Sequence, residues 1–401
     1  MKRAVKIFVF LIFCSKIFGI CLEECIKLAI MNNTEIFLAG QDLEIAKSKL
    51  NQAKTVNFPK LQLGAYYNRY NLNYPAIFSS AIGAFNLEEN SQFLYGTRIV
   101  LTQPLYTGGK NKTLIKQAEQ NLLSAKSVYL TMKNRLIYNV RKSYVDVIYL
   151  KKKHNILKNA ISQIEKIKGK GKEGILYKNT KQLHEIEIKL TDAIFKLNSI
   201  VDTEFIDIEK IENTLEVPEE NFLEEDVQKY IVIALEKRPE FSGLRAREFI
   251  DSLSVELGKN FRFPNIDLFS TYDYLKPSQG GWLSNFQVGM SLSIPLFDGG
   301  ARWQQLKEKN ALFKKTKALV GSKEEEIKRE VMEALEKLKL SQKFYELAGK
   351  QKEEFSMPVK AIPEDIERWK EANFDILDAE RKFILAKFYL SYVTGEDIEK
   401  Y

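Results

Sequence analysis

The sequence predicts a mostly helical chain with membrane β-structure, built as two tandem copies of a long α-helical hairpin that each carry a β-hairpin. Leu101–Lys110 reads LTQPLYTGGK and Leu292–Ala301 reads LSIPLFDGGA, so one proline-aromatic-Gly-Gly motif occurs twice. Each copy follows alternating polar and apolar residues, which is typical of a strand with two different faces. Each copy precedes a long stretch without proline, and such a stretch favours a long helix.

Residues 1–19 are predicted to be a signal peptide. Lys2, Arg3 and Lys6 precede the short apolar run Ile7–Phe13, and this order is typical of export signals. A short N-terminal anchor is the alternative. Ile20 before Cys21 does not fit a lipoprotein cleavage site, so no lipid anchor is expected. No later run approaches the ~20 apolar residues that a spanning helix needs.

Charge and cysteine content exclude two further classes of protein. The formal net charge is +8, and removal of the four basic residues of the signal leaves +4, spread over mixed-charge helices. Nucleic-acid binding usually needs a concentrated basic face, so no nucleic-acid partner is expected. Cys21 and Cys25 stand four residues apart and do not make a disulfide framework. Free thiols and one local bridge both remain open.

The second half of the sequence aligns with the first half at an offset of 205 residues. NNTEIF at Asn32–Phe37 aligns with KRPEFS at Lys237–Ser242, and the dipeptide Phe-Pro occurs at both 58 and 263. At the Gly-Gly motif the offset is 191, so the first copy holds 14 extra residues between Tyr67 and Leu101. Their Pro, Gly, Ser and Asn content predicts a loop. The expected repeats are 20–214 and 215–401.

Each repeat is expected to run through the same elements in the same order. The first holds a helix over about 22–55, a β-hairpin at 60–104, a long helix at 110–168, a return helix at 174–200 and a mid-section linker. The second holds a helix at 225–259, a β-hairpin at 265–295, a long helix at 301–356 and a return helix at 364–393.

The last strand has the clearest alternation. One face carries Phe286, Val288, Met290, Leu292 and Ile294, and the other carries Asn285, Gln287, Gly289, Ser291 and Ser293. Large apolar residues opposite small polar ones suit a barrel wall with lipid outside and water inside. A half-buried soluble sheet shows the same alternation and is the alternative.

The repeated motif predicts a sharp corner from strand to helix. Pro104 and Pro295 lack an N–H for the β-ladder, so we expect them to end the strands. The glycine pairs accept a positive φ, which lets the chain turn into the helix. They are Gly108, Gly109, Gly299 and Gly300.

The long helices show coiled-coil spacing and fix a layout. In 110–168 apolar or small residues fall alternately three and four apart from Ile115 to Leu136, which indicates helices packed side by side. This helix would be ~90 Å long, so two shorter helices end to end would match it. One chain offers four strands, which do not close a barrel, whereas three chains would give 12.

The sequence resembles the TolC-like outer-membrane efflux protein family over essentially its whole mature length. The resemblance rests on QPLYTGGK, IPLFDGGA, the Phe-Pro before each first strand, and NFDILDAERKFILAKFYLSYVTGE near the end. It implies a homotrimer, with a 12-stranded β-barrel in the outer membrane of a Gram-negative-type bacterium and an α-helical barrel in the periplasm. It also implies a passive exit duct for tripartite efflux or type I secretion, with an inner-membrane transporter and a periplasmic adaptor as partners.

In that family the helical turns form a closable aperture. Here they fall at about 165–176 and 356–365. Candidate aperture residues are Gly171, Gly174, Glu364, Asp365, Glu367 and Arg368. The alternative is that the charges are solvated helix ends, favoured by the first-turn dipole. The stretch PVKAIPEDIERWKEANFD departs from the family with two prolines and Trp369, so no adaptor contacts are assigned.

No enzyme, cofactor or metal site is expected. GKGKEG at Gly169–Gly174 fits a phosphate-loop pattern but follows a helix, not a strand, and is interpreted as a turn. His154 and His184 each stand alone without ligand spacing. The alternative function is a periplasmic or surface coiled-coil scaffold, which has no need of the two hairpins. The transported substrate does not follow from the sequence.

Overall fold

The computed structural model describes residues 21–72, 76–80, 83–87, 90–167, 172–202, 217, 221–277, 281–354 and 362–396. The predicted signal peptide lies outside them. The described residues form long helices and a small antiparallel sheet, which confirms the predicted fold class. Spatial contacts divide the chain into a helical unit (Met1–Leu43, Ala125–Gly243, Gly321–Tyr401) and a sheet unit (Glu44–Ser124, Leu244–Val320). Each unit takes segments from both predicted repeats.

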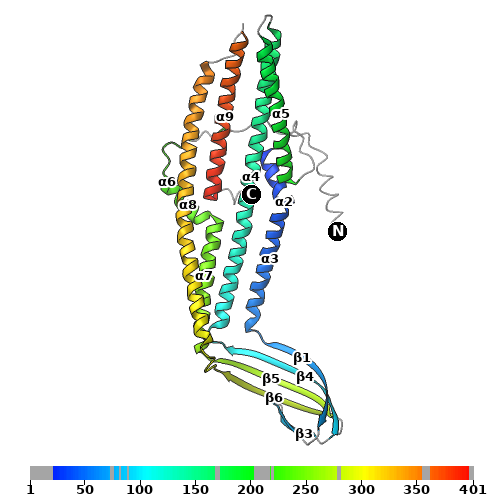
Figure 1. Ribbon diagram of the computed structural model, residues 1–401. Helices are drawn as coiled ribbons and strands as arrows, with labels where there is room; N and C mark the ends of the chain where they lie inside the picture. Colours follow the sequence, from blue (N-terminus) through cyan, green and yellow to red (C-terminus); the bar gives the residue numbers. More distant parts are fainter. Residues whose placement is uncertain are drawn as a thin grey trace. The chain divides into compact units, whose positions relative to one another are not determined.

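The sheet unit is built on a four-stranded antiparallel sheet in the order β1-β4-β5-β6 (Figure 1). The strands are β1 (Lys60–Leu72), β4 (Asn90–Tyr106), β5 (Asn265–Pro277) and β6 (Leu283–Ser293). The central β4–β5 pair joins residues distant in sequence, with Arg98 directly opposite Asp273. β1 and β6 are therefore the two edges of this sheet.

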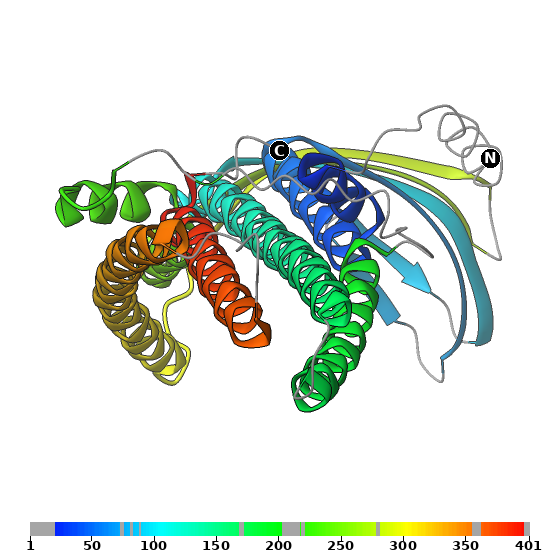
Figure 2. The same ribbon diagram turned by 90° about the horizontal axis from the view of Figure 1, so that it is seen from above.

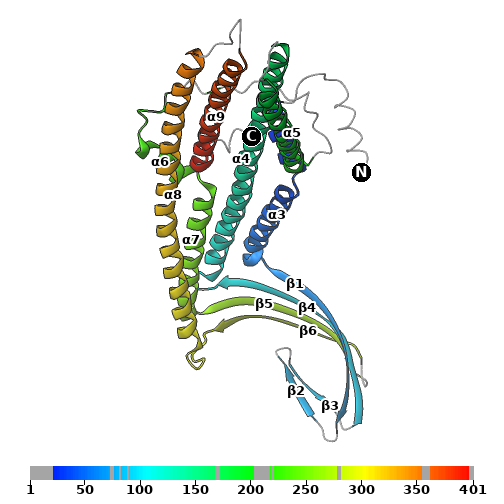
Figure 3. The same cartoon turned by 45° about the horizontal axis from the view of Figure 1, so that its top comes forward.

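The prediction of a loop between Tyr67 and Leu101 is wrong in one respect, because this stretch contains two more strands. β2 (Ala76–Ser80) and β3 (Gly83–Leu87) form a separate two-stranded hairpin, visible beside the main sheet in Figure 3. Phe78 lies directly opposite Phe85 in its register. Aromatic and β-branched residues favour extended backbone, and here they outweigh the turn-forming residues around them.

Two short 3-10 turns lead helices into the first strand of each hairpin. α3 (Thr34–Lys54) passes through Thr55–Asn57 into β1, and α7 (Pro239–Lys259) passes through Asn260–Arg262 into β5. The N–H of Phe58 bonds to the Thr55 carbonyl at 3.0 Å, and that of Phe263 bonds to the Asn260 carbonyl at 3.1 Å. The strands return into α4 (Lys110–Lys166) and α8 (Ala301–Glu354).

The single helices expected at 22–55 and 225–259 are each broken in two. α2 (Leu22–Asn32) is separated from α3 by Asn33, and α6 (Val227–Lys237) from α7 by Arg238. Asn33 accepts the Ile36 N–H through its side chain at 3.0 Å and so caps α3. Arg238 precedes Pro239, and a residue before proline is disfavoured in the helical region.

The helical unit packs α5 (Lys172–Val201) and α9 (Pro363–Thr394) with parts of α4 and α8. Figure 2 shows α4 with α5 along one side and α9 along the other. The predicted coiled-coil positions Ile137, Val140, Tyr144 and Val147 are fully or almost fully buried, and they pack against Cys25 and Leu197. The buried core of this unit therefore lies where the apolar spacing placed it.

Among the described residues, no helix combines the length and the apolar content that crossing a bilayer requires.

Candidate functional site

One face of the four-stranded sheet is apolar and exposed. The register places Leu63, Ile99, Tyr272 and Phe286 in a row across all four strands, and their side chains are 74, 40, 43 and 70% exposed. Further exposed apolar residues on this face are Leu61, Tyr67, Leu101, Val288, Met290 and Leu292. An exposed apolar surface of this extent marks a contact with lipid or with another apolar surface.

The opposite face is mixed: it carries charged, polar and small residues together with the large apolar residues Tyr66, Leu94, Val100, Phe269 and Leu275. One register row on it is Gly64, Arg98, Asp273 and Asn285. Arg98 Nε lies 2.6 Å from Asp273 Oδ1, and the Asp273 side chain is fully buried. Directly opposed strand residues of opposite charge stabilise the pairing. One face of the sheet therefore offers an exposed apolar surface, while the other holds the charged Arg98–Asp273 pair.

The two Gly-Gly corners share their backbone conformation. Gly108, Gly109, Gly299 and Gly300 have φ values of 59°, 81°, 69° and 87°, a region that L-residues with a Cβ rarely adopt. The corners differ in packing. A Cβ on Gly108 would lie 2.5 Å from the Phe263 Cβ, whereas one on Gly299 would meet nothing within 4 Å.

Pro104 does not end its strand, contrary to expectation. β4 continues to Tyr106, with a register shift between Pro104 and Tyr106 against β5. The pairing of β4 with β1 ends at Thr102, which lies opposite Lys60. Pro104 is therefore at an edge-like position next to an irregularity, where a missing N–H is tolerated. At the second corner β6 ends at Ser293, before Pro295.

Polar side chains that sequence reasoning missed fasten both corners. Gln103 Nε2 donates to the Asn57 carbonyl at 2.7 Å, and Asn111 Nδ2 donates to Asn57 Oδ1 at 2.9 Å. At the second corner the Asp298 carboxylate accepts the Gly300 N–H at 3.1 Å and pairs with Arg302 Nε at 2.7 Å. The Asp-Gly-Gly sequence was the available signal, because aspartate commonly accepts a backbone N–H two residues on.

A buried ionic network ties α9 to α5 where α9 begins. Lys370, 2% exposed, donates to Glu367 Oε2 and to Asn179 Oδ1, each at 2.7 Å, and to Gln182 Oε1 at 3.2 Å. These three acceptors match the three donors of an ammonium group. Asn179 also donates to Glu367 Oε1, and the Lys178 ammonium lies 3.5 Å from Glu367.

Hydrogen bonds favour the charged form of Glu367 in this network. Burial alone would raise the pKa of Glu367, but the hydrogen bonds from Lys370 and Asn179 outweigh it and lower that pKa. Ala160 and Ile164 of α4 pack beside it against Ile366, with Trp369 partly buried in the same cluster. Three helices therefore meet at this end through one apolar cluster and one ionic network.

The candidate aperture residues differ in burial and in contacts. Glu367 belongs to the network, whereas Glu364 and Arg368 are exposed and Asp365 is half-buried in the first turn of α9. Gly174 is exposed within the first turn of α5, and Gly171 lies outside the described residues. Lys370, Asn179 and Gln182 were missed, although the i,i+3 spacing of Glu367 and Lys370 was visible in the sequence.

Further along the helical unit, α4 and α9 are joined by a second set of polar contacts. Tyr149 donates to Asp378, Lys152 pairs with Glu380 at 2.8 Å, and Arg381 Nη2 lies 2.7 Å from Asp146. Burial and the hydrogen bond to Asp378 both raise the pKa of Tyr149. The α4–α9 contact therefore depends on charge as well as on apolar packing.

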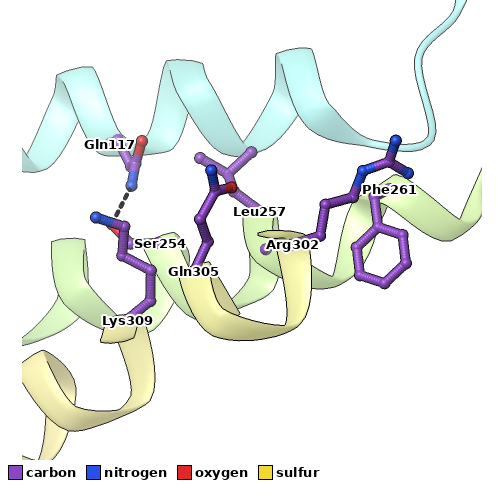
Figure 4. Close-up of a pocket in the computed structure, with 8 residues that line it drawn as sticks. Gln117, Ser254, Leu257, Phe261, Arg302, Gln305 and Lys309 are labelled. Atoms are coloured by element: carbon purple, nitrogen blue, oxygen red, sulfur yellow. Dashed lines mark hydrogen bonds between the residues drawn. The ribbon is translucent and has the colours of Figure 1, made fainter. Parts of the chain in front are cut away.

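A cavity of about 400 Å³ lies between α4, α7 and α8 in the sheet unit (Figure 4). In its lining, Gln117 Nε2 donates to Ser254 Oγ at 2.9 Å. Arg302 lies on its wall beside the Phe261 ring, 5.4 Å from the ring centroid. Its lining holds no carboxylate, histidine or cysteine, so it does not assemble the groups of a catalytic or metal centre.

The described part of the chain contains no cluster of three or more His, Cys, Asp or Glu side chains arranged for a metal ion. Gly169 of the GKGKEG stretch lies outside the described residues. Cys21 and Cys25 are both free thiols, which decides the alternative that the sequence left open.

Comparison with known proteins agrees with this architecture. Residues 25–168 match the model of the family described as outer membrane efflux protein. The solved Campylobacter jejuni CmeC outer membrane channel is 15% identical with a TM-score of 0.67, over 93% of this chain and 85% of that chain. The open state of the Neisseria gonorrhoeae MtrE outer membrane channel is 15% identical with a TM-score of 0.73, over 93% and 89%.

The outer membrane protein VceC from Vibrio cholerae is 14% identical with a TM-score of 0.69, over 93% of this chain and 96% of that chain. No curated protein matches the sequence. The predicted resemblance to outer-membrane efflux proteins is confirmed, and the fold is that of these solved channels. The matching family and structures are channel proteins, not enzymes.

Proposed function

We propose that this chain, similar to outer membrane efflux proteins and folded like their channels, is the outer-membrane duct of a tripartite efflux or type I secretion system. It would pass substrates delivered by an inner-membrane transporter and a periplasmic adaptor, without an energy source or reaction of its own. The observation that carries this proposal is the sheet whose one face is apolar and exposed and whose other face carries polar side chains, among them the Arg98–Asp273 pair.

Open strand edges support a homotrimer. β1 and β6 end the described four-stranded sheet, and unpaired backbone groups in lipid cost several kcal/mol each, roughly. Pairing β6 of one copy with β1 of the next would satisfy both edges, and three copies would close 12 strands. The second copy would thereby complete a structure that one chain leaves open.

Exposed apolar residues on the helices support the same assembly. On α8, Leu312 and Leu319 stand seven residues apart, as do Leu340 and Leu347, and all four are exposed. Tyr177, Ile188 and Phe195 of α5 are 73, 64 and 66% exposed. A seven-residue apolar spacing is suited to packing against another helix, so these stripes would be buried between copies.

A duplicated architecture with repeats 20–214 and 215–401 is part of the proposal. Two features of the fold recur at the sequence offset of 205. The helix breaks at Asn33 and Arg238 correspond, and so do the 3-10 turns Thr55–Asn57 and Asn260–Arg262. The two Gly-Gly corners would then carry each repeat from membrane barrel to helical tunnel.

The closable end of the duct is proposed to lie at the α4–α5–α9 end. Lys370 and Glu367 would hold α9 on α5 there, and Gly174, Glu364, Asp365 and Arg368 would lie along the opening. The burial of Lys370 and its three acceptors support this assignment. The signal at 1–19 would export the chain to the outer membrane, with the helices in the periplasm.

The first experiment is expression with the native signal, separation of the membranes and mass measurement of the detergent-extracted protein. A mass of three mature chains in the outer-membrane fraction, with conductance in planar bilayers, is expected. A soluble monomer or dimer would contradict the duct and favour the coiled-coil scaffold, because four or eight strands from such a species do not give the proposed 12-stranded barrel.

A further inference from the structure

The two histidines of the chain converge on one carboxylate. The sequence contains only His154 and His184, and each was expected to stand alone in its helix. That expectation is wrong. His154 Nε2 of α4 lies 3.5 Å from Glu187 Oε1, and His184 Nδ1 of α5 lies 3.0 Å from Glu187 Oε2. Glu187 therefore lies between an imidazole of each helix.

This triad joins the two helices of one hairpin. His184 and Glu187 are three residues apart on α5, which places them on the same helix face. His154 reaches them from α4 and is the more buried imidazole, with 22% of its side chain exposed against 69% for His184. The contact lies in the helical unit, between α4 and α5, on the N-terminal side of the described end of α4 at Lys166.

Imidazoles are the side chains whose charge ordinarily changes between about pH 5 and pH 8. Hydrogen bonding from His184 lowers the pKa of Glu187, burial opposes this, and the bond from His154 lowers it further. Glu187 is therefore a carboxylate across that range. Neutral imidazoles give it hydrogen bonds alone, whereas imidazolium ions give it charge-assisted bonds, which are stronger.

Other charges near the triad are mostly basic. Lys151 and Lys158 of α4 lie one helical turn from His154, and Lys181 of α5 lies one turn before His184. Glu185 is exposed on α5 between His184 and Glu187. Glu187 is the carboxylate that contacts both imidazoles, and it would compensate a positive charge on either of them.

We propose that His154, His184 and Glu187 form a proton-binding clasp that holds α4 against α5 more tightly at pH 5.5 than at pH 7.5. The proposal goes beyond the duct function and does not depend on it. The clasp needs a charged imidazole and a charged carboxylate at the same pH, and pH 5.5 lies between the ordinary ranges of these two kinds of group. A metal ion is the competing ligand, and the experiment includes it.

The experiment uses the full chain, purified in detergent with an affinity tag that contains no histidine. Because the chain has two histidines, the ¹H–¹³C spectrum of the imidazole ε1 groups has two signals to follow. Glu187→Gln keeps the shape and removes the charge. Glu185→Gln is the matched control, since it removes the same charge two residues away. Amide hydrogen exchange, corrected for the intrinsic pH dependence, reports the protection of 150–160 and 180–190.

The clasp requires that Glu187→Gln move both imidazole signals and that Glu185→Gln leave them in place. Protection of both segments should rise about two- to fivefold from pH 7.5 to pH 5.5, the range for exposed ion pairs. The rise should persist in Glu185→Gln and vanish in Glu187→Gln. His154→Gln should abolish it too, which tests the link from the α4 side.

Three results would overturn the proposal. The first is a full rise in protection in Glu187→Gln. The second is movement of the His184 signal alone, which would mean that α4 takes no part. The third is a shift of both signals at pH 7.5 on adding micromolar Zn²⁺, reversed by EDTA and accompanied by higher protection. That last result would reassign the triad as a metal site.

Discussion

The ammonium of Lys370 lies 2.7 Å from the Glu367 carboxylate, and the two residues stand three apart at the start of α9. Neither group is in open solvent, since their side chains are 2% and 13% exposed. Asn179 contacts both of them from α5. A charged pair with this little water around it depends on both partners, because either one alone would be left buried and uncompensated.

Replacement of Lys370 by methionine should therefore destabilise the α5–α9 contact by about 3 kcal/mol or more. Methionine keeps most of the volume but leaves Glu367 without its main partner. Denaturant unfolding of the folded protein measures the loss. Arg368→Gln is the control, because Arg368 is exposed, and should change stability by less than about 0.5 kcal/mol. Adding Glu367→Gln to Lys370→Met should recover part of the loss, and a double variant as unstable as the single one would contradict this account.

Acid should weaken the same contact in a defined range. The pKa of Glu367 is lowered by its bonds to Lys370 and Asn179. A carboxyl group whose pKa is lowered by folding stabilises the fold above its unfolded value, about 4.3. That contribution is lost as the pH falls through the lower, folded value. Stability measured from pH 7 to pH 3 should thus fall more in the wild type than in Glu367→Gln, with the difference confined below about pH 4.5. Parallel stability curves for the wild type and Glu367→Gln would contradict this role of Glu367.

The two corners should respond differently to alanine. Gly108→Ala brings a Cβ to 2.5 Å from Phe263 at a positive φ, whereas Gly299→Ala has the same φ problem without the contact. We expect a loss of about 1 kcal/mol for Gly299→Ala and at least about twice that for Gly108→Ala, since the clash adds to the backbone strain. Unfolding of both variants after refolding into lipid vesicles measures the difference. Equal losses would mean that Phe263 moves aside at no cost.

Neighbouring residues of β6 should test which face of the sheet meets lipid. Met290 is on the apolar face and 71% exposed, and Ser291 is on the polar face. Arginine on the lipid face of a barrel costs about 2–4 kcal/mol near the membrane midplane, and less toward the interfaces. Met290→Arg should lower the yield of membrane-inserted protein and Ser291→Arg should not. A heat-resistant oligomer on gels provides the readout, and the reverse order of effects would invert the assignment of the faces.

The two cysteines should differ in reactivity. Cys25 is fully buried, and burial is the main cause that raises the pKa of its thiol to about 12. At pH 8 its thiolate would be roughly a thousandfold scarcer than that of an ordinary cysteine. A maleimide should label the folded mature chain once, at the half-exposed Cys21, and label it twice after unfolding. Cys21→Ser should abolish labelling of the folded chain; persistent single labelling there would show that Cys25 is accessible.

Much of the fold was predictable because apolar periodicity and glycine placement are local signals. The buried stripe through Ile137, Val140 and Tyr144 follows from the spacing of those residues alone. The helix breaks were harder to predict from the sequence. Pro239 gave a sign of the second break, which the long helical pattern concealed, while the break at Asn33 depends on a side-chain cap that competes closely with helix continuation.

The ionic contacts were not predictable, because they join residues distant in sequence. Lys370 and Asn179 are 191 positions apart, and Arg98 and Asp273 are 175 apart. A lysine among glutamates at helical spacing usually lies on a solvated face, and the partners that Lys370 has on α5, Asn179 and Gln182, are distant in sequence. His154 and His184 were missed for the same reason, since their partner Glu187 is local to only one of them.

The open edges of the sheet have a consequence for biogenesis. On the way to the proposed trimer, each chain would carry the two open edges of its described sheet and an exposed apolar face until the copies meet. Species of this kind are the ones from which aggregates grow. Assembly of the proposed trimer would therefore compete with aggregation. We expect this chain to need a chaperone that covers its strands, and to be produced best when synthesis is slow.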